Sequence, residues 1–359
     1  MHGLVMREPP VEGPVVIGIL HPPEWFGEPE AFAAACRAIE AIDPRIEVVV
    51  VTYEEGQSLR TMRGGEAHLA EARAAAPALT DAQRAMFERV HAVIAIDLPF
   101  DVGSIAPRLA WVQGIGAGYA QLQSAGLAEA GIRFSNGAGV NAVGIAEFVV
   151  GRILEERKHF RALAERQAAR DWSPLYGTQL AGTTVGLIGL GAINSAVAER
   201  LRGFDVELLA TRRSACDGDV AADVDELFPT RRLHEMLARC DTVVAAVPET
   251  PETIGLIDAA AFAAMPRGAF FINVGRGVTV DEGALLDALR SGHLRGAALD
   301  VTAVEPLPVE HPLWDAPGLT LSFHCSSSPD AMFQNLHRLV CDNVRRWLDG
   351  EPLRNEVTG

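Results

Sequence analysis

The sequence predicts an α/β protein with two domains, each built on a doubly wound parallel sheet. The chain has 359 residues, enough for two hydrophobic cores of ordinary size. Short apolar runs alternate with helical patterns along both halves, as expected when helices cover both faces of parallel sheets. Near the middle, an apolar run enters Gly189-Leu190-Gly191 and an Ala-rich amphipathic segment follows at once. This order predicts a strand, a tight turn and a helix.

Composition narrows the function classes before any motif is considered. Hydrophobic residues make up 48% and charged residues 22% of the chain, the balance of a globular protein. The formal charge of −16, without a dense basic cluster, argues against nucleic-acid binding, and the apolar runs are too short to cross a membrane. Residues 1–14 are polar and proline-bearing, so we expect a loose leader and no signal peptide.

The cysteines are five in number, scattered, and without a Cys-x-x-Cys pair. This usage argues against a disulfide framework and against a zinc site, and it fits the reducing cytoplasm. We therefore expect a cytoplasmic protein without a metal. The five are Cys36, Cys216, Cys240, Cys325 and Cys341.

The first half is expected to contain four strands and three helices. The pattern at 29–42 places Phe32 and Ile39 on one helix face, and 46–52 is a β-branched run typical of a strand covered on both faces. A helical pattern at 66–90 is broken by Pro77 and restarts with Thr80 as N-cap. The expected strands are 15–20, 46–52, 92–96 and 109–113, and the third helix is 121–130.

The second half repeats this alternation. It opens with a long helical pattern at 140–160 and an irregular arm at 161–180 that carries Trp172 and Tyr176, and a final helix is expected at 330–348. Between the arm and this helix lie six apolar runs separated by helical segments, which is the strand count of a dinucleotide-binding sheet. These strands are expected at 185–189, 206–210, 242–247, 269–274, 297–301 and 319–322.

The glycine turn is a candidate phosphate site. Gly189 permits a sharp turn, and Gly191 lets a pyrophosphate approach the first amides of the following helix, which begins at Ala192 and Ile193. The third glycine of the usual fingerprint is replaced by Asn194. Taken alone, a Gly-x-Gly pair is as often an ordinary strand-to-helix turn, so the surrounding sequence has to decide.

The end of the next predicted strand indicates the cofactor. An NAD site uses Asp or Glu there to bind the ribose 2′-hydroxyl. Here the strand ends with Thr211, Arg212, Arg213 and Ser214, and Arg212 falls where the acidic residue usually stands. The two guanidinium groups and two hydroxyl groups of these residues could bind a ribose 2′-phosphate. The predicted cofactor is therefore NADP, with NAD possible. The alternative is a basic turn that faces solvent.

Five motifs in the second half carry a resemblance. They are GLGAI at 189–193, VPETPET at 247–253, MPRGA at 265–269 running into INVGRG at 272–277, ALDV at 298–301 with EPLP at 305–308, and HPLW at 311–314. WVQGIGAG at 111–118 and Ala146-Glu147 agree with them. In this order they resemble the D-isomer-specific 2-hydroxyacid dehydrogenase family, in its glyoxylate/hydroxypyruvate reductase-like form. The match covers roughly residue 109 to the C-terminus, and the first hundred residues agree only in architecture.

The resemblance implies a domain division. A flavodoxin-like substrate domain would comprise residues 1–139 and 325–359, and a Rossmann cofactor domain would comprise 140–324. The last helix would return to the N-terminal unit, and the active site would lie in the cleft between the domains. The arm at 161–180 resembles the dimerisation element of the family, which implies a homodimer.

The resemblance also implies site residues. Interconverting a 2-oxo and a 2-hydroxy acid needs a cation for the carboxylate and the carbonyl, and a proton donor. Arg276 would bind the substrate, His324 would be the general acid/base, and Glu305 would stabilise the imidazolium. Without the family motifs, these residues are equally a surface arginine, a structural histidine and a solvated carboxylate. The family usually has proline before this histidine and a small residue after it, whereas Phe323 and Cys325 stand here.

The remaining implied residues contact substrate or cofactor. Ala117 and Gly118 would donate backbone N–H groups to the substrate carboxylate, and Asp300 would hold the nicotinamide carboxamide. Further cofactor residues would be Pro248, Thr253 and Val274.

The sequence therefore predicts an NADP(H)-preferring oxidoreductase that interconverts a small 2-oxo acid, such as glyoxylate or hydroxypyruvate, and its D-2-hydroxy acid. One alternative is the same enzyme class with D-lactate, phosphoglycerate or a bulkier 2-oxo acid. Glu54-Glu55 argues against a dianionic phosphate, and Leu98-Pro99-Phe100 suggests an apolar lining. The other alternative is a non-enzymatic nucleotide-sensing protein of the same fold.

Overall fold

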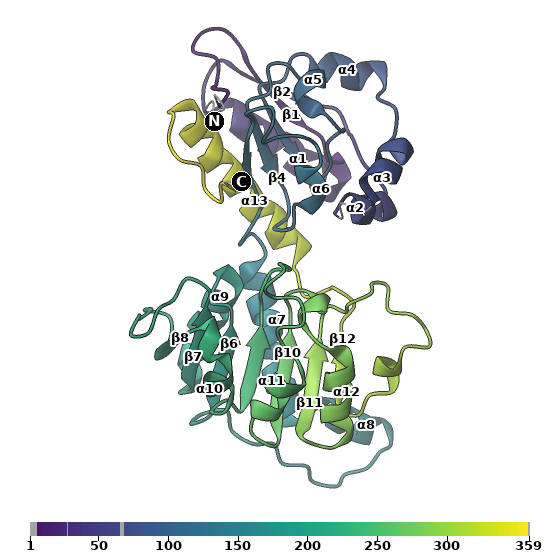
Figure 1. Cartoon of the computed structure of the whole chain (residues 1–359), viewed down its shortest axis with the longest axis vertical. Coiled ribbons are helices and arrows are strands. Elements are labelled where there is room, and N and C mark those ends of the chain that lie inside the picture. Colours follow the sequence, from purple (N-terminus) through teal and green to yellow (C-terminus); the bar gives the residue numbers. More distant parts are fainter. Residues whose placement is uncertain (1–5, 27, 65–67, 358–359) are drawn as a thin grey trace. The chain divides into compact units, whose positions relative to one another are not determined.

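The computed structural model describes residues 6–26, 28–64 and 68–357. The chain divides into two compact units, one made of Met1–Val140 with Pro329–Gly359 and the other of Asn141–Ser328 (Figure 1). Both are α/β units with parallel sheets, as expected. In neither is a helix of the described residues both long and apolar enough to cross a membrane.

The first unit contains a five-stranded sheet in the order β2-β1-β3-β4-β5, and every neighbouring pair is parallel. This is the 2-1-3-4-5 order of flavodoxin-like folds. The four predicted strands are present, and β5 was missed because it has only three residues. The strands are β1 (Val15–Ile19), β2 (Ile46–Val50), β3 (Ala92–Ala95), β4 (Trp111–Gly114) and β5 (Arg133–Ser135).

Helices cover this sheet on both faces. The chain returns for the last of them, α13, which contacts α1 and packs Trp347 against Trp111 at a ring-centroid distance of 5.6 Å. The helices are α1 (Pro29–Glu40), α2 (Gln57–Arg63), α3 (Leu69–Ala75), α4 (Asp81–Phe87), α5 (Val102–Ile105), α6 (Ala120–Gln123) and α13 (Pro329–Leu348).

Two helix predictions have different outcomes. Thr80 caps α4 with a complete capping box, in which its hydroxyl accepts from Gln83 N–H and Gln83 accepts from Thr80 N–H, so this prediction is confirmed. The predicted helix 121–130 is wrong, because α6 ends at Gln123 and Gly126 takes a left-handed φ of +78°. The beginning of the predicted helix 66–90 lies partly outside the described residues.

The leader is attached where it is described. The guanidinium of Arg7 donates to the carbonyls of Ala106 and Leu109, at 3.2 and 2.9 Å, and Arg45 donates to those of Pro10 and Val11. The expectation of a loose leader is therefore wrong for residues 6–14, and residues 1–5 lie outside the described part.

The second unit contains a seven-stranded parallel sheet in the order β12-β11-β10-β9-β6-β7-β8. Counted from β6, this is the 3-2-1-4-5-6 order of a Rossmann sheet with one strand added beside the sixth. All six predicted strands are present. The missed strand, β8, is short and ends in a proline. The strands are β6 (Thr184–Ile188), β7 (Glu207–Arg212), β8 (Glu226–Pro229), β9 (Thr242–Ala245), β10 (Ala269–Asn273), β11 (Leu294–Leu299) and β12 (Leu319–Leu321).

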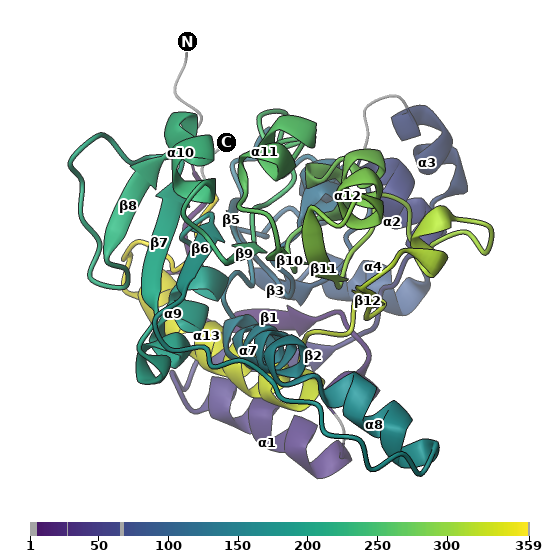
Figure 2. The ribbon, with the colours of Figure 1, turned by 90° about the horizontal axis from the view of Figure 1, so that it is seen from below.

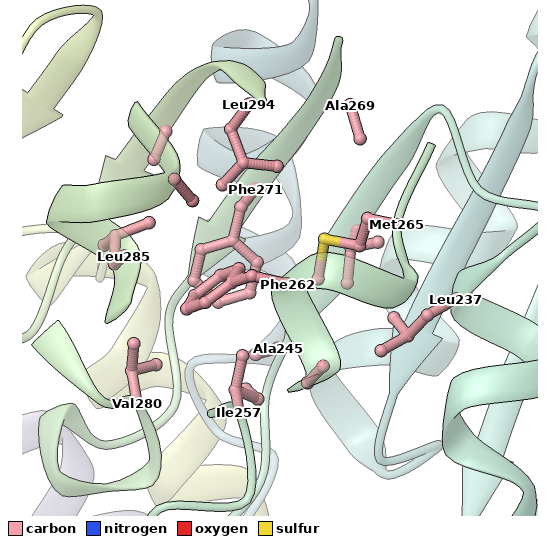
Figure 3. Packing of buried hydrophobic residues seen from close by; sticks show 14 of the residues in the cluster. Leu237, Ala245, Ile257, Phe262, Met265, Ala269, Phe271, Val280, Leu285 and Leu294 are labelled. Atoms are coloured by element: carbon pink, nitrogen blue, oxygen red, sulfur yellow. The ribbon is translucent and has the colours of Figure 1, made fainter. Parts of the chain in front are cut away.

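The two faces of this sheet have separate cores. Figure 2 shows α7 and α9 on one face and α10, α11 and α12 on the other. On the second face Phe271 of β10 meets Phe262 of α11 edge to face at 5.3 Å, beside Leu285 of α12 (Figure 3). The helices are α7 (Ala142–Lys158), α9 (Ala192–Leu201), α10 (Leu233–Leu237), α11 (Ala259–Ala264) and α12 (Glu282–Arg290).

The expected irregular arm is partly helical. His159 adopts a left-handed φ of 57° that ends α7, and α8 (Phe160–Ala168) follows directly. Residues 171–180 form neither helix nor strand, in agreement with the prediction. Because α8 has no buried residue, its formation leaves little sequence pattern to detect.

Candidate active site

The three residues with predicted catalytic roles lie on the loops that follow three adjacent strands of the second unit. Arg276 follows β10, Glu305 lies on the loop after β11, and His324 follows β12. Since β10, β11 and β12 are neighbours and run parallel, all three loops leave the carboxyl edge of the sheet. Ligands of open α/β sheets bind at this edge.

The imidazole of His324 is bonded to Glu305. Its Nδ1 lies 2.8 Å from Glu305 Oε2, and the backbone N–H of Thr302 donates to Glu305 Oε1 at 3.0 Å. A carboxylate accepts only, so Nδ1 carries the proton in this bond. The other ring nitrogen, Nε2, has no acceptor or donor among the described residues and is free to exchange a proton with a ligand.

The loop that carries His324 has an unusual backbone. Phe323 and His324 both lie in the left-handed region, with φ of 55° and 58°. Proline fixes φ near −65°, so it could not occupy position 323 in this conformation. The replacement of the usual proline by phenylalanine therefore agrees with the loop's geometry. The Phe323 ring is exposed and lies 5.8 Å from that of Trp314.

Asp300 holds this loop. Its carbonyl accepts the His324 N–H at 2.6 Å, and its carboxylate accepts hydrogen bonds from Cys325 N–H at 2.9 Å, Ser322 Oγ at 2.8 Å and Ser326 Oγ at 2.5 Å. The residue is only 3% exposed. Its carboxylate oxygens are thus engaged within the protein, which makes Asp300 a support of the His324 loop. The sequence indicated only a nicotinamide contact.

Arg276 presents an unpaired guanidinium. Nη1 donates to Gly275 O at 2.8 Å, and within the described residues no carboxylate lies within 4 Å of the guanidinium. The turn is stabilised because Thr279 Oγ1 donates to Arg276 O at 2.6 Å. Gly277 packs so closely that a Cβ there would lie 1.9 Å from the carbonyl carbon of Thr302. The Arg276 turn is therefore in direct backbone contact with the Glu305 loop.

The glycine turn has the geometry of a phosphate site. Gly189 has a φ of 84°, and a Cβ built on Gly191 would meet nothing within 4 Å, so the space in front of the helix is open. The N–H groups of Ala192 and Ile193, in the first turn of α9, have no protein acceptor in the described chain. A dinucleotide pyrophosphate fits these observations.

Asn194 stands where the third glycine is usual, and its side chain forms hydrogen bonds that a glycine could not form. It is fully buried, and its Nδ2 donates to Ile188 O and Gly189 O, both at 3.0 Å. The side chain thus closes the strand end that the glycine turn leaves open. In the sequence, the only indication of this role is that an asparagine replaces the usual glycine.

The residues at the carboxyl end of β7, whose last residue is Arg212, differ in their roles. Arg212 is half-buried and Arg213 exposed, and in the part of the chain that the structure describes neither forms an ion pair. Thr211 is 2% exposed, and its hydroxyl accepts the Gly189 N–H at 3.1 Å. Thr211 therefore supports the glycine turn, and its contact with the cofactor stays a prediction. The two arginines fit a 2′-phosphate, because neither is bonded to a carboxylate of the described residues.

The other predicted cofactor residues lie on loops of the same edge. Thr253 Oγ1 donates to Pro248 O at 2.6 Å and accepts Thr250 N–H at 2.8 Å, so it shapes the loop after β9. Val274 is 5% exposed and follows β10. Pro248 is exposed.

In the first unit, Ala117 and Gly118 follow β4 on an exposed loop. The Ala117 carbonyl accepts from Asn136 Nδ2 at 3.1 Å, whereas the N–H groups of Ala117 and Gly118 meet no acceptor among the described residues. Two neighbouring unpaired N–H groups are able to bind a carboxylate.

Two ion pairs that the sequence does not reveal lie at the carboxyl edge of the first unit's sheet, one buried and one partly buried. Arg63 donates to Glu55, which also accepts from the Tyr53 hydroxyl at 2.8 Å, and Arg60 pairs with Asp97 at 2.7 Å. Burial and the neighbouring Glu55 carboxylate raise the pKa of Tyr53. These cations are therefore neutralised. Among the described residues, no group of His, Cys, Asp and Glu side chains could hold a metal.

Comparisons with known proteins agree with this geometry. Residues 150–326 match the family model described as "D-isomer specific 2-hydroxyacid dehydrogenase, NAD binding domain". A glyoxylate reductase of Thermofilum pendens is 34% identical over 260 residues, covering 70% of this chain and 75% of that protein.

Two solved structures cover nearly the whole chain. A D-isomer specific 2-hydroxyacid dehydrogenase of Xanthobacter autotrophicus, in complex with NADPH and MES, has a TM-score of 0.73 and 26% identity and covers 97% of this chain and 98% of its own. An NADPH-dependent glyoxylate/hydroxypyruvate reductase of Sinorhizobium meliloti, with NADP and sulfate, has a TM-score of 0.70 and 26% identity and covers 96% and 98%. This chain belongs to the D-isomer specific 2-hydroxyacid dehydrogenase family.

Proposed function

We propose that this protein reduces a small 2-oxo acid, such as glyoxylate or hydroxypyruvate, with NADPH to the corresponding 2-hydroxy acid, which has the D configuration where the product is chiral. The single observation that carries the proposal is the His324–Glu305 pair at 2.8 Å on the same sheet edge as the unpaired guanidinium of Arg276. The glyoxylate reductase and the NADPH-bound relatives support it.

The residues divide the chemistry among them. Arg276 would bind the carboxylate and polarise the 2-oxo group, assisted by the N–H groups of Ala117 and Gly118. His324 would donate a proton from Nε2 to the carbonyl oxygen as it becomes a hydroxyl. Glu305 would stabilise the protonated ring that makes this donation possible. When bound, the reduced nicotinamide supplies the hydride.

The cofactor would lie along the carboxyl edge of the second unit. Gly189, Gly191 and the first amides of α9 would hold its pyrophosphate, and Arg212 and Arg213 would bind the 2′-phosphate. We propose accordingly that the second unit is the cofactor domain, and that the first unit contributes substrate contacts.

A phosphorylated substrate is less well supported. The arginines near the carboxyl ends of β2 and β3 are Arg60 and Arg63, and each is already bonded to a carboxylate, Asp97 and Glu55 respectively. A dianionic phosphate at this edge would have to break a buried ion pair, which costs several kcal/mol, on the order of 3–5. This favours a substrate with one carboxylate and a small uncharged remainder.

We also propose that the protein is a cytoplasmic homodimer. Trp172 is 99% exposed and Tyr176 is 85% exposed, both on the arm after α8. Two large aromatic side chains exposed on one short segment are typical of a protein–protein interface. All five cysteines are free, which fits a reducing compartment.

The test is a panel of 2-oxo acids assayed with NADPH and with NADH. We expect glyoxylate or hydroxypyruvate with NADPH to give the highest kcat/KM. Preference for a phosphorylated acid would select the alternative substrate class. Nucleotide binding without turnover of any 2-oxo acid would support the nucleotide-sensing alternative and overturn the proposal.

A further inference from the structure

Glu282, the first residue of α12, holds the turn that presents Glu305. Its Oε1 accepts the backbone N–H of Ala303 at 2.8 Å, two residues before Glu305. Its side chain is only 14% exposed. The contact fixes one end of the turn from the side of α12.

The same turn is held from other sides. Thr302 N–H donates to Glu305 Oε1 at 3.0 Å, and Thr302 Oγ1 donates to Val304 O at 2.9 Å. Behind it, Gly277 leaves no room for a Cβ against Thr302. The Ala303 N–H bond to Glu282 therefore restrains the turn on the side that Gly277 does not cover.

His311 orients Glu282. Its Nε2 lies 3.5 Å from Glu282 Oε2, while Leu313 N–H donates to its Nδ1 at 3.4 Å. Because Nδ1 accepts, the ring proton of neutral His311 sits on Nε2, which faces the carboxylate. His311 is the N-cap of the short helix η6 (Pro312–Asp315), so this contact connects the HPLW motif to α12.

We propose that Glu282 is a positioning residue for the acid/base pair. Oriented by His311, it keeps the turn at Ala303 in place, so that Glu305 stays within hydrogen-bond distance of His324. It acts through the backbone and touches no reacting atom. The inference rests on the proposed function, because it concerns the residues that move the proton.

A purely structural role makes different predictions. An acidic side chain at a helix N-terminus stabilises the helix by roughly 0.3–1 kcal/mol through the macrodipole. If that were all, removing Glu282 would lower the melting temperature and leave the pH dependence of turnover unchanged. If Glu282 positions Glu305, the pH dependence must change as well.

The experiment compares Glu282→Ala and Glu282→Gln with wild type in the full chain. For Glu282→Ala we expect kcat for 2-oxo acid reduction to fall by roughly 10-fold, with the Kd for NADPH unchanged. The pH profile of reduction should also differ from that of wild type, as it should in Glu305→Gln. Glu282→Gln can still accept from Ala303, but its NH₂ group meets the Nε2–H of His311, so we expect a smaller effect of the same kind. Asp287→Ala, which removes an exposed carboxylate from the same helix, should resemble wild type.

A double-mutant cycle completes the test. When Glu305→Gln is already present, adding Glu282→Ala should lower kcat by less than about 2-fold, because the group that it positions is gone. Fully additive losses, or a wild-type pH profile in both Glu282 variants, would overturn the inference while leaving the proposed function intact. If Glu282→Ala does not fold, the Gln variant alone decides. An inactive wild type would overturn both.

Discussion

His324 Nδ1 and Glu305 Oε2 lie 2.8 Å apart, although the side chains are 54% and 38% exposed. A contact so accessible to solvent adds little to stability, typically about 0–1 kcal/mol even for a charged pair. The protein nevertheless holds both residues in place: Thr302 N–H donates to the Glu305 carboxylate, and His324 N–H donates to the carbonyl of Asp300. Proton transfer at the His324 imidazole explains why these two residues are held together, whereas a contribution to folding stability does not.

Glu305→Gln therefore changes the pH dependence of turnover. The carboxylate stabilises the protonated imidazole, and reduction requires that form as proton donor. Without the carboxylate, the protonated ring loses its hydrogen-bond acceptor, so kcat for reduction should fall and its dependence on pH should differ from that of wild type. Initial rates between pH 5 and 9 measure this directly. A profile identical to that of wild type would separate Glu305 from the proton transfer.

Much of the fold could be predicted because the responsible signals are local. The strands of the second unit are apolar runs buried on both faces, such as β10, and the Thr80 capping box lies within four residues. The elements that were missed lack such signals. β8 has four residues and a proline, and α8 buries no side chain, so neither has a periodicity to read.

The site was predictable only in part, for a similar reason. Arg276, Glu305 and His324 stand in motifs, whereas the roles of Asp300, Thr211 and Glu282 depend on contacts between distant segments. Thr211 and Gly189 are 22 residues apart in sequence, yet they share a hydrogen bond because β6 and β7 are neighbours. Only the sheet order reveals such partners.

Cofactor choice should depend on Arg212 and Arg213 at the carboxyl end of β7, which form no ion pair among the described residues. Wild type should show the higher kcat/KM with NADPH. The double variant Arg212→Asp/Arg213→Ala should shift the ratio toward NADH by at least ~10-fold, or ~1.4 kcal/mol, for loss of a charge-assisted phosphate contact. Arg231→Ala is the control, since Arg231 is exposed and pairs with Asp217. Equal use of both cofactors by wild type would contradict the assignment.

Stability should decrease in mild acid because of His91. Its buried Nδ1 accepts the Val16 N–H of β1 at 3.0 Å, and burial, with a smaller contribution from Arg108, lowers the pKa of His91 below 6.5. The unfolded chain then takes up the proton first as the pH falls through about 6.5, so unfolding becomes easier until the folded pKa is passed. One such group changes the free energy of unfolding by at most ~1.4 kcal/mol per pH unit.

His91→Asn tests this prediction, because an amide oxygen can accept the same bond without titrating. Urea midpoints at pH 7.5, 6.5 and 5.5 should decline less steeply in the variant than in wild type. Buried His21, whose pKa is also lowered by burial, should leave a residual decline. Parallel curves for the two proteins would exclude His91 as a cause.

Substitutions of Arg276 should impair both binding and chemistry. Arg276→Ala should raise KM for the 2-oxo acid steeply and lower kcat, since the guanidinium would orient the substrate and polarise its carbonyl. Arg276→Lys should recover little, because a point charge cannot reproduce a two-pronged contact. Steady-state kinetics with the best acid of the panel supply the measurement. Full recovery by lysine would argue against bidentate binding.

Substitutions of His324 should lower turnover without weakening cofactor binding, unlike the combined effect expected for Arg276. His324→Asn and His324→Ala remove the proton donor but no cofactor contact, so the Kd for NADPH should remain close to that of wild type while kcat falls by roughly 10²–10⁴. His234→Ala, which removes an exposed histidine of α10, is the control. The critical result is that NADPH binding is kept while turnover is lost. If the substitution merely disrupted the His324 loop, both cofactor binding and turnover would decrease. Near-wild-type turnover in both His324 variants, with a substrate that wild type reduces, would remove His324 from the mechanism.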